Sequence, residues 1–514
     1  MVSFLPQRLQ HQYCSEVEVS MELTNELALL LLLLIPLIAG GLIPLFSNRP
    51  NIREAITFLA GILLLLNVFF LLNAINSGAK PELYLFRFAG NFDVRLELEP
   101  LGAIFAAIAS SLWIVNSLFT LGYMRGNKEK NQTRFFGLVA IAIFGAMGIA
   151  ASANLITLFI FYELLTISTF PLVTHKGDMK AKRGGTIYAL VLMGTSLMFL
   201  LPAILGTHIV AGHSDFVVGG IFPSGTSNFT TSILLLLFVF GIGKAALMPM
   251  HFWLPNAMVA PTPVSALLHA VAVVKAGVFS VLKITIFIFG ESVMADMNMS
   301  TCLSWVAAIT IVLASIIALR KDNLKARLAY STVSQLAYIT LAAMLATPAA
   351  FIGGALQIVM HAWGKITLFM CAGAIYTISH RTEVSKLDGL GRTMPWVFGA
   401  FLVASISIIG IPPMGGSWPK YFLIVGALES GKGILTAALV LSSILNIVYL
   451  IPISIRAFLK PPTDISVDNG LIEVRKKNIW VIVPPVISAA GAFILFFYVG
   501  SIIDFLQPVV SVGE

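Results

Sequence analysis

Lysine and histidine side chains interrupt an otherwise apolar stretch between residues 241 and 277. Lys244, His269 and Lys275 lie within this stretch, and prolines divide it into pieces. Proline removes a backbone donor and kinks a helix, so we expect a broken helix, a short re-entrant segment and a second helix. Charged groups at membrane depth are costly and mark ion or proton pathways. The stretch is therefore predicted to be the active segment of a membrane transporter.

A single acidic residue, Glu163, falls in the middle of a predicted membrane span, within LFIFYELLTISTF. A charged carboxylate in hydrocarbon needs a partner, and Lys244 is the natural candidate. A close Glu163–Lys244 pair would keep both groups charged, and separating the pair would release the Lys244 proton. We interpret the pair as a switch. The alternative is a static ion pair that joins two helices.

Further basic residues are spaced for a proton relay. His269 and Lys275 are six residues apart, which is about 9 Å along a helix axis. His361 and Lys365 are at i and i+4, so they share one helix face, and Lys420 is a candidate exit residue. The alternative for the histidines is a hydrogen-bonded position at a helix interface. Because these groups are scattered over several spans, they suit proton hopping better than the binding of one bulky solute.

Other polar residues of the spans are assigned smaller roles. Lys283 lies nearer the end of its span and is interpreted as a lysine that extends to the membrane surface. Tyr330, Ser331 and Ser334 could hold water, but a packing role is preferred for them.

The composition indicates a polytopic membrane protein. Of 514 residues, 58% are hydrophobic and 11% are charged, with a mean hydropathy of +0.93, whereas soluble domains carry about 25% charged residues. The net charge of +8 fits a bias of Lys and Arg toward one membrane side better than nucleic-acid binding. The three cysteines lack metal or redox spacing, and no nucleotide, haem or other cofactor motif occurs. No cofactor and no metal site are expected.

Fourteen candidate spans alternate in the charge of their connections. Of the 32 Lys and Arg residues, 22 lie in connections 1–2, 3–4, 5–6, 9–10, 11–12 and 13–14. Basic connections favour the cytoplasmic side, so we expect a multi-pass cell-membrane protein with both termini outside. The spans, each about 20 apolar residues or longer, lie at approximately 27–46, 55–74, 100–122, 135–151, 154–174, 184–210, 230–252, 258–288, 302–319, 328–347, 350–379, 395–428, 434–455 and 479–503.

Spans seven and twelve share Gly and Pro interruptions and one lysine each. They are five spans apart, so the two units face opposite ways, and interrupted helices in corresponding halves mark inverted-repeat transporters. The predicted fold is all-α and polytopic, with two inverted five-helix repeats and broken helices 7 and 12. The predicted division is a polar extension 1–26 with Met21 as an alternative start, helices 1–3 in 27–134, a first repeat (helices 4–8) in 135–288, a second repeat (helices 9–13) in 302–455, and helix 14 in 479–514.

Several motifs resemble a known family. FYELL, GIGKAALMPMHFWLPNAMVAPTPVSALLHAVAVVKAGVF, LKARLAYSTVSQLAYI, HAWGKITLF and KLDGLGRTMP with the following GIPP are similar to the antiporter-like subunits of respiratory complex I, of membrane-bound hydrogenases and of multisubunit Mrp-type cation/proton antiporters (the D-type chain of the latter). The resemblance covers about residues 100–430. It implies fourteen helices with two inverted repeats, Glu163 and Lys244 as the switching pair, Lys275 as the central relay and Lys420 as the terminal one.

The predicted function is that of a proton-translocating, non-redox subunit of a multisubunit membrane complex. Its expected partners are other membrane subunits, lipid, and protons or sodium ions. The main alternative is the D-type chain of an Mrp-type Na⁺/H⁺ antiporter without redox partners. A stand-alone solute carrier, a passive scaffold and an inorganic-carbon uptake subunit with a soluble partner are further alternatives. The sequence leaves the coupling ion, the parent complex, the stoichiometry and the direction of pumping open.

Overall fold

The computed structural model describes residues 7–89, 92–461, 475 and 478–510. Up to residue 241 its helices and strands are α1 (Gln7–Leu42), α2 (Pro50–Asn76), β1 (Glu82–Ala89), β2 (Phe92–Glu97), α3 (Pro100–Gly126), α4 (Gln132–Ala150), α5 (Leu155–Val173), α6 (Met179–Thr195), α7 (Leu201–Ala211) and α8 (Asn228–Gly241).

The remaining α-helices follow the first broken span. They are α9 (Trp253–Asn256), α10 (Thr262–Ala266), α11 (Val273–Ile284), α12 (Gly290–Ala295), α13 (Asn298–Arg320), α14 (Leu324–Leu345), α15 (Pro348–Ser379), α16 (Leu390–Thr393), α17 (Pro395–Ile409), α18 (Ser417–Glu429), α19 (Thr436–Leu459), α21 (Val483–Ile494) and α22 (Val499–Val510).

Short 3₁₀ and π-helical segments connect or interrupt these helices. The 3₁₀ segments are η2 (Ile43–Phe46), η4 (Gly243–Ala245), η5 (Met250–Phe252), η6 (Ala257–Val259), η9 (Val384–Lys386), η10 (Gly433–Leu435) and η11 (Ile479–Val481). The π-helical segments are η3 (Ser196–Leu200), η7 (Leu267–Val271) and η8 (Thr285–Phe289).

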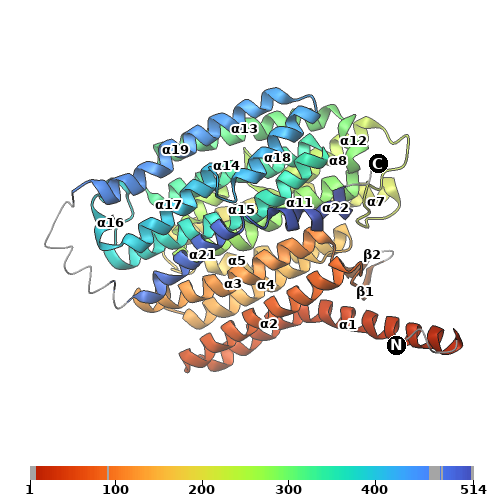
Figure 1. Cartoon of the computed structure of the whole chain (residues 1–514), viewed down its shortest axis with the longest axis horizontal. Coiled ribbons are helices and arrows are strands. Elements are labelled where there is room, and N and C mark those ends of the chain that lie inside the picture. Colours follow the sequence, from red (N-terminus) through yellow and green to blue (C-terminus); the bar gives the residue numbers. More distant parts are fainter. Residues whose placement is uncertain (1–6, 90–91, 462–474, 476–477, 511–514) are drawn as a thin grey trace.

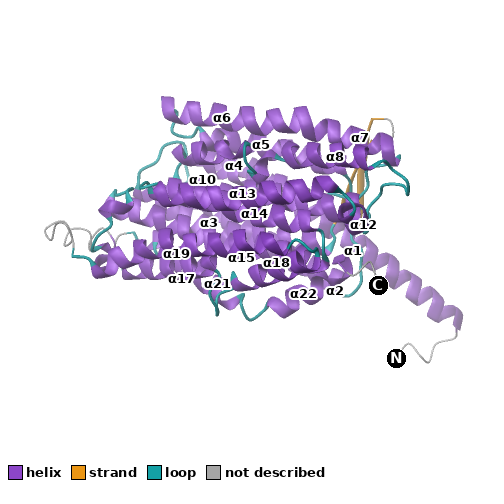
Figure 2. Cartoon of the chain, turned by 90° about the horizontal axis from the view of Figure 1, so that it is seen from above, coloured by secondary structure: helices purple, strands orange, loops and turns teal. Residues whose placement is uncertain are grey.

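The helices lie side by side in one bundle (Figure 1). In that view α1 and α2 form one edge, α13 and α19 form the opposite edge, and α11, α14 and α15 lie between them. Seen from above, the N-terminal part of α1 projects beyond the bundle (Figure 2). The predicted polar extension is therefore helical from Gln7 onward and continuous with the first span.

Burial separates the central helices from the peripheral ones. The most apolar window of Thr262–Ala295 is 100% buried and that of Leu324–Leu345 is 94% buried, whereas the window of Pro50–Asn76 is 33% buried. A membrane helix that is apolar on all sides faces either lipid or other helices. The exposed faces of α2 therefore form a broad apolar surface suited to contact with lipid. The central helices instead have nearly every face covered by protein along these windows, and Lys275 and Lys283 are enclosed there.

Polar side chains at helix starts explain where several spans begin. Each caps the free backbone N–H groups of the first turn. Glu99, Asn154, Asp178, Asn323 and Thr347 accept from the amide three residues later, at the starts of α3, α5, α6, α14 and α15. These caps fix the ends of the helices that carry the candidate residues.

The predicted breaks in spans seven and twelve are confirmed. α8 ends at Gly241 and is followed by η4, and α17 ends at Ile409 before α18 begins at Ser417. The described residues contain eleven helices long and apolar enough to cross a membrane, or twelve if the pair Ile479–Ile494 and Val499–Val510, bent by 69°, is one span. The predicted fourteen is not reached by this test because spans seven and twelve are each divided into shorter helices. The division into two inverted repeats stays a prediction.

A two-stranded antiparallel hairpin, β1–β2, was not predicted. It joins α2 to α3, and its register pairs Glu82 with Glu97 and Ala89 with Phe92. The alternating polar and apolar residues of 82–97 are typical of a half-buried hairpin, but a search for long apolar spans passes over so short a segment.

Candidate functional site

Lys244 lies at the break of span seven, in the turn η4 directly after α8. Its Nζ donates to the Tyr162 carbonyl oxygen (2.9 Å) and to the Thr166 hydroxyl (2.6 Å), both on α5. The backbone amide of Lys244 donates to the Tyr162 hydroxyl (3.1 Å), and Nζ lies 3.1 Å from the centre of the Tyr162 ring. The side chain is fully buried. The break therefore turns a lysine toward α5, where neutral oxygens and one aromatic ring hold it.

Glu163 follows Tyr162 on α5, but its carboxylate does not contact the Lys244 amine. Among the described residues no ion pair within 4.0 Å joins the two side chains. Both Glu163 carboxylate oxygens are buried and have no hydrogen-bond partner there. The predicted partners are thus neighbours that are separated in this structure, and their role as a switch stays a prediction.

Gly277 lets α11 pack directly on the Lys244 turn. A Cβ atom at Gly277 would lie 2.4 Å from the carbonyl carbon of Lys244 and 2.4 Å from the amide nitrogen of Ala245. Both are backbone atoms, so a side chain at this position requires one of the two segments to move. The position of Lys244 relative to α11 therefore depends on a glycine at residue 277.

We expect Gly277→Ala to lower the unfolding temperature of the purified protein, because overpacking of this kind costs about 1–3 kcal/mol. This cost exceeds the gain of about 0.5–1 kcal/mol from replacing glycine by alanine inside a helix. Gly194→Ala in α6 is the matched control, since nothing lies within 4 Å of the added Cβ. Thermal unfolding in detergent measures both variants. Equal unfolding temperatures for the two would contradict the expectation.

Lys275 and His361 form the centre of the candidate site. Lys275 on α11 and His361 on α15 are both buried, and Lys275 Nζ lies 2.7 Å from His361 Nδ1. His361 Nε2 has no hydrogen-bond partner among the described residues. A neutral imidazole accepts at one ring nitrogen and donates from the other, so an ammonium at Lys275 leaves an N–H at His361 Nε2. The pair can hold one proton and pass it from one side to the other.

His269 lies in η7, on the same span as Lys275, but the two side chains are not joined by a hydrogen bond. The imidazole ring of His269 lies 4.5 Å from the ring of Phe369 on α15. Both ring nitrogens are buried and have no partner among the described residues. His269 thus lies inside the protein, between α3 and α15. No described residue forms a hydrogen bond with either of its ring nitrogens.

Lys365 is linked to hydroxyl groups that were not predicted to take part. It is buried on α15, one turn from His361, and its Nζ donates to the Ser331 hydroxyl on α14 (2.6 Å). The Tyr449 hydroxyl on α19 donates to the same Ser331 oxygen (2.7 Å) and also bonds to Asn446. The packing role preferred for Ser331 is therefore wrong, because this serine connects Lys365 to α19.

Lys420 lies just after the break of span twelve and binds the end of the preceding helix. Its Nζ donates to the carbonyl oxygen of Ile409, the last residue of α17 (2.5 Å), and to the Ser443 hydroxyl (2.7 Å). A broken helix leaves its last carbonyl groups without partners, and a lysine can satisfy them. The hydroxyl groups of Ser442 and Ser334 lie 3.2 Å apart. The contacts of Tyr449 with Ser331, of Ser442 with Ser334 and of Lys420 with Ser443 together make up a polar seam along α19. The seam extends from the Lys365 region to the Lys420 region.

Lys283 differs from its interpretation as a surface-reaching lysine. Its side chain is fully buried, and Nζ lies 3.0 Å from the Glu99 carboxylate and donates to the Ser152 carbonyl oxygen (2.8 Å). The cap of α3 supplies this carboxylate, which no pattern near Lys283 could reveal.

The described residues contain no group of three or more His, Cys, Asp or Glu side chains that could hold a metal ion.

Comparison with known proteins places the chain in a family. A family profile described as "NADH:quinone oxidoreductase/Mrp antiporter, TM" matches residues 152–446. NADH-quinone oxidoreductase subunit N of Desulforudis audaxviator is 30% identical over 373 residues, which cover 71% of this chain and 73% of that protein. The A/B chain of a probable K⁺/H⁺ antiporter of Rhizobium meliloti is 32% identical over 408 residues, which cover 76% of this chain and 39% of that protein.

A third relative is NAD(P)H-quinone oxidoreductase chain 5 of Synechocystis sp., with 31% identity over 350 residues, which cover 65% of this chain and 50% of that protein. The chain thus spans half or less of the length of the Synechocystis and Rhizobium proteins.

Two solved structures share the fold. One chain of the Mrp complex from Dietzia sp. has a TM-score of 0.83 at 20% identity, covering 95% of this chain and 97% of that one. One chain of the membrane-bound sulfane sulfur reductase, an archaeal respiratory membrane complex, has a TM-score of 0.74 at 22% identity, covering 94% and 99%. Because the family profile matches more than half of the residues, this multi-pass membrane protein belongs to the antiporter-like family shared by NADH:quinone oxidoreductases and Mrp antiporters.

Proposed function

We propose that this chain is a proton-translocating subunit of a multisubunit membrane complex related to respiratory complex I, and that it moves protons through a Glu163–Lys244 switch and a Lys/His relay. The observation that carries the proposal is the 2.7 Å contact between Lys275 and His361, two proton carriers enclosed at the centre of the bundle. Enclosed amines of this kind mark proton or ion paths in membrane proteins.

The first step is the movement of Lys244 relative to Glu163. When the two are close, the carboxylate attracts the ammonium and holds its proton. In the arrangement described here, Lys244 contacts only neutral oxygens and the Tyr162 ring. An ammonium in that position has lost its counter-charge, so its proton passes to a base deeper in the protein. The close packing of α11 on the Lys244 turn at Gly277 would couple this movement to the helix that carries Lys275.

The later steps follow the polar contacts between helices. The proton shared by Lys275 and His361 moves one turn along α15 to Lys365, which is bonded to Ser331. The seam of hydroxyl groups between α14 and α19 then leads to Lys420 as the terminal residue. Direct contacts join Lys275 to His361 and Lys365 to Ser331. The transfers between these groups would pass through bridging water, because general acid–base transfer requires a donor and an acceptor within hydrogen-bond reach, directly or through one water.

A sodium/proton or potassium/proton antiporter chain is the second candidate. It is favoured by the relative named as part of a probable K⁺/H⁺ antiporter, which is 32% identical over 408 residues. In either case the expected partners are other membrane proteins of one complex, and the basic connections favour an orientation with both termini on the outer side of the cell membrane. The polypeptides that co-purify in mild detergent would identify the complex.

The two candidates differ in their need for a metal cation. We expect the complex, purified with its partners and reconstituted in vesicles, to move protons with Na⁺ and K⁺ replaced by an organic cation, as followed with a pH-sensitive dye. An antiporter exchanges the proton for a cation, so it stops when the cation is removed. Proton movement that strictly requires Na⁺ or K⁺ would contradict the first candidate in favour of the second.

A further inference from the structure

Asn116 on α3 is a buried polar residue that the relay described above does not use. Its side chain is 1% exposed, and neither its amide nitrogen nor its amide oxygen has a hydrogen-bond partner among the described residues. A buried polar group without a hydrogen-bond partner is energetically costly. Buried polar groups without protein partners are therefore commonly met by ordered water.

Two contacts fix how α3 lies against the span that carries the candidate lysines. Tyr123 and Thr262 line the same cavity at one end, and the Phe105 and Phe279 rings lie 4.9 Å apart at the other. The two segments are antiparallel, because the residue numbers rise along one as they fall along the other. Since an α-helix rises by about 1.5 Å per residue, and the second segment departs from this at the π-helical η7, a residue between these contacts can be matched to its neighbour on the other segment to within about one turn.

This alignment places Asn116 at the level of His269. Asn116 is seven residues before Tyr123, and His269 is seven residues after Thr262. Asn116 is also close to two turns from Tyr123 and three turns from Phe105, since about 3.6 residues make a turn. It therefore lies on the face of α3 that meets the other span, and α3 does pack against η7, the segment that contains His269.

Ser265 completes a group of unmet polar atoms at this interface. It lies on α10, four residues before His269. Its hydroxyl oxygen is buried without a partner among the described residues, as are both ring nitrogens of His269. We propose that Asn116, Ser265 and His269 hold a buried water cluster. This cluster would pass protons to the relay from the membrane side on which the Lys- and Arg-rich connections lie.

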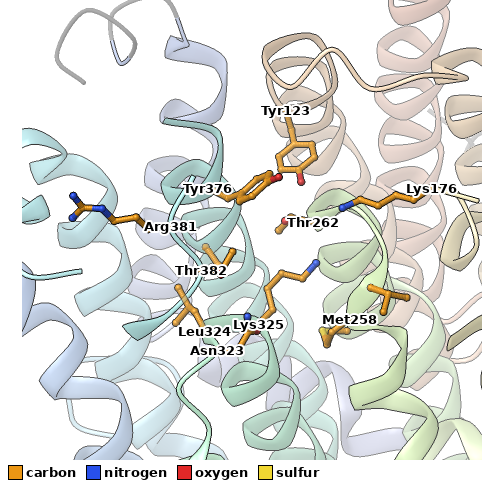
Figure 3. Close-up of a pocket in the computed structure, with 12 residues that line it drawn as sticks. Tyr123, Lys176, Met258, Thr262, Asn323, Leu324, Lys325, Tyr376, Arg381 and Thr382 are labelled. Atoms are coloured by element: carbon orange, nitrogen blue, oxygen red, sulfur yellow. The ribbon is translucent and has the colours of Figure 1, made fainter. Parts of the chain in front are cut away.

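A cavity lies at the end of this interface where Lys176 and Lys325 are found, and it would be the entrance of the proposed uptake route. It has a volume of about 220 Å³ and is lined by Tyr123, Thr262, Lys176 and Lys325 among others. Figure 3 shows the two lysines reaching into it from opposite sides, with the Tyr123 hydroxyl pointing toward Thr262. A water molecule takes up about 30 Å³ in the liquid, so the cavity holds several. Ser265 follows the lining residue Thr262 by three residues, close to one helical turn.

The lining of the cavity offers no site for a metal cation. Among the described residues no Asp or Glu lines it, whereas Lys176, Lys325 and Arg381 do. A metal cation would find there none of the carboxylate ligands that hard cations prefer. A proton instead moves along hydrogen bonds between water and hydroxyl groups. The inference rests on the proposed function and adds to it an uptake route, with the proton as the transported ion.

Asn116→Thr and Asn116→Val form the matched test, because the two side chains have the same shape and differ by one hydroxyl group. In the reconstituted complex we expect the threonine variant to keep most of the initial rate of proton uptake and the valine variant to lose about 10-fold or more. Ser110→Ala on the same helix is the control, since the Ser110 hydroxyl is bonded to its own helix at Ala106 (2.8 Å). Equal uptake rates for the threonine and valine variants would overturn the proposal.

A high-resolution cryo-EM map of the wild-type complex tests the water site without any transport assay. We expect density for ordered water within hydrogen-bond distance of Asn116 and His269, and its loss in the valine variant. An empty interface in the wild-type map would overturn the proposal. If water is present while Lys244→Ala still pumps, the proposed function fails and the hydrated site stands, so the two failures are distinguishable.

Discussion

Lys244→Ala is expected to abolish proton translocation while the complex still assembles. The variant removes the only amine at the η4 turn, so no group there can take a proton near Glu163 and release it on moving away. The loss of assembly is expected to be small because Lys244 is held by neutral groups, Tyr162 and Thr166, and no buried partner charge is left in contact. The measurement is the initial rate of proton pumping in vesicles, normalised to the amount of this protein in the purified complex.

The control for this variant is Lys432→Ala. Lys432 lies just before η10, beyond the end of α18, and its Nζ is 3.5 Å from the Ser300 hydroxyl. We expect its pumping rate to stay near that of the wild type. Normal pumping by Lys244→Ala would refute the switch.

The second large effect is expected from Lys275→Ala. This variant removes one of two proton carriers that are 2.7 Å apart and leaves His361 without its donor. Loss of a positioned acid–base group costs about 10²–10⁴-fold in rate, so we expect pumping to fall at least about 100-fold. The same vesicle assay measures the rate, and co-purification of the partner proteins measures assembly.

Lys283→Met is the matched control for Lys275→Ala, because it removes a buried lysine from the same helix. Lys283 is paired with Glu99 and donates to Ser152, so its loss leaves the Glu99 carboxylate with its cap bond to the α3 amide alone and destabilises the fold by up to about 3–5 kcal/mol. We expect a lower unfolding temperature but retained pumping per folded molecule. If the Lys275→Ala variant pumped as well as the Lys283→Met variant, Lys275 would be excluded as a relay residue.

Local signals in the sequence were enough to locate the broken helices and most of the buried bases, with Lys283 as the exception. Gly and Pro punctuation acts on the backbone directly, and it predicted the ends of α8 and α17. A lysine with apolar neighbours on both sides cannot easily reach water, and Lys244, Lys275 and Lys365 are indeed fully buried. The i, i+4 spacing also placed His361 and Lys365 on one helix, α15.

The partners of these bases could not be predicted from local patterns. Serine hydroxyls in helices often bond to their own backbone, as Ser110 does, whereas Ser331 bonds to Lys365 and Tyr449. The two serines look alike in the sequence, and only the packing of α14 against α15 and α19 separates them. Glu163 and Lys244 were expected to be in contact because each needs a partner, but the Tyr162 carbonyl and the Thr166 hydroxyl satisfy the amine instead.

The order of the relay, with Lys244 before Lys275, is tested most directly by charge displacement during a single turnover of the complex in a membrane on a capacitive electrode. In Lys275→Ala we expect a small transient, because Lys244 still releases its proton inward although sustained transport has stopped. The double variant Lys244→Ala/Lys275→Ala is predicted to show no transient. A transient of equal size in the single and double variants would contradict the account, because charge would then enter the protein without Lys244.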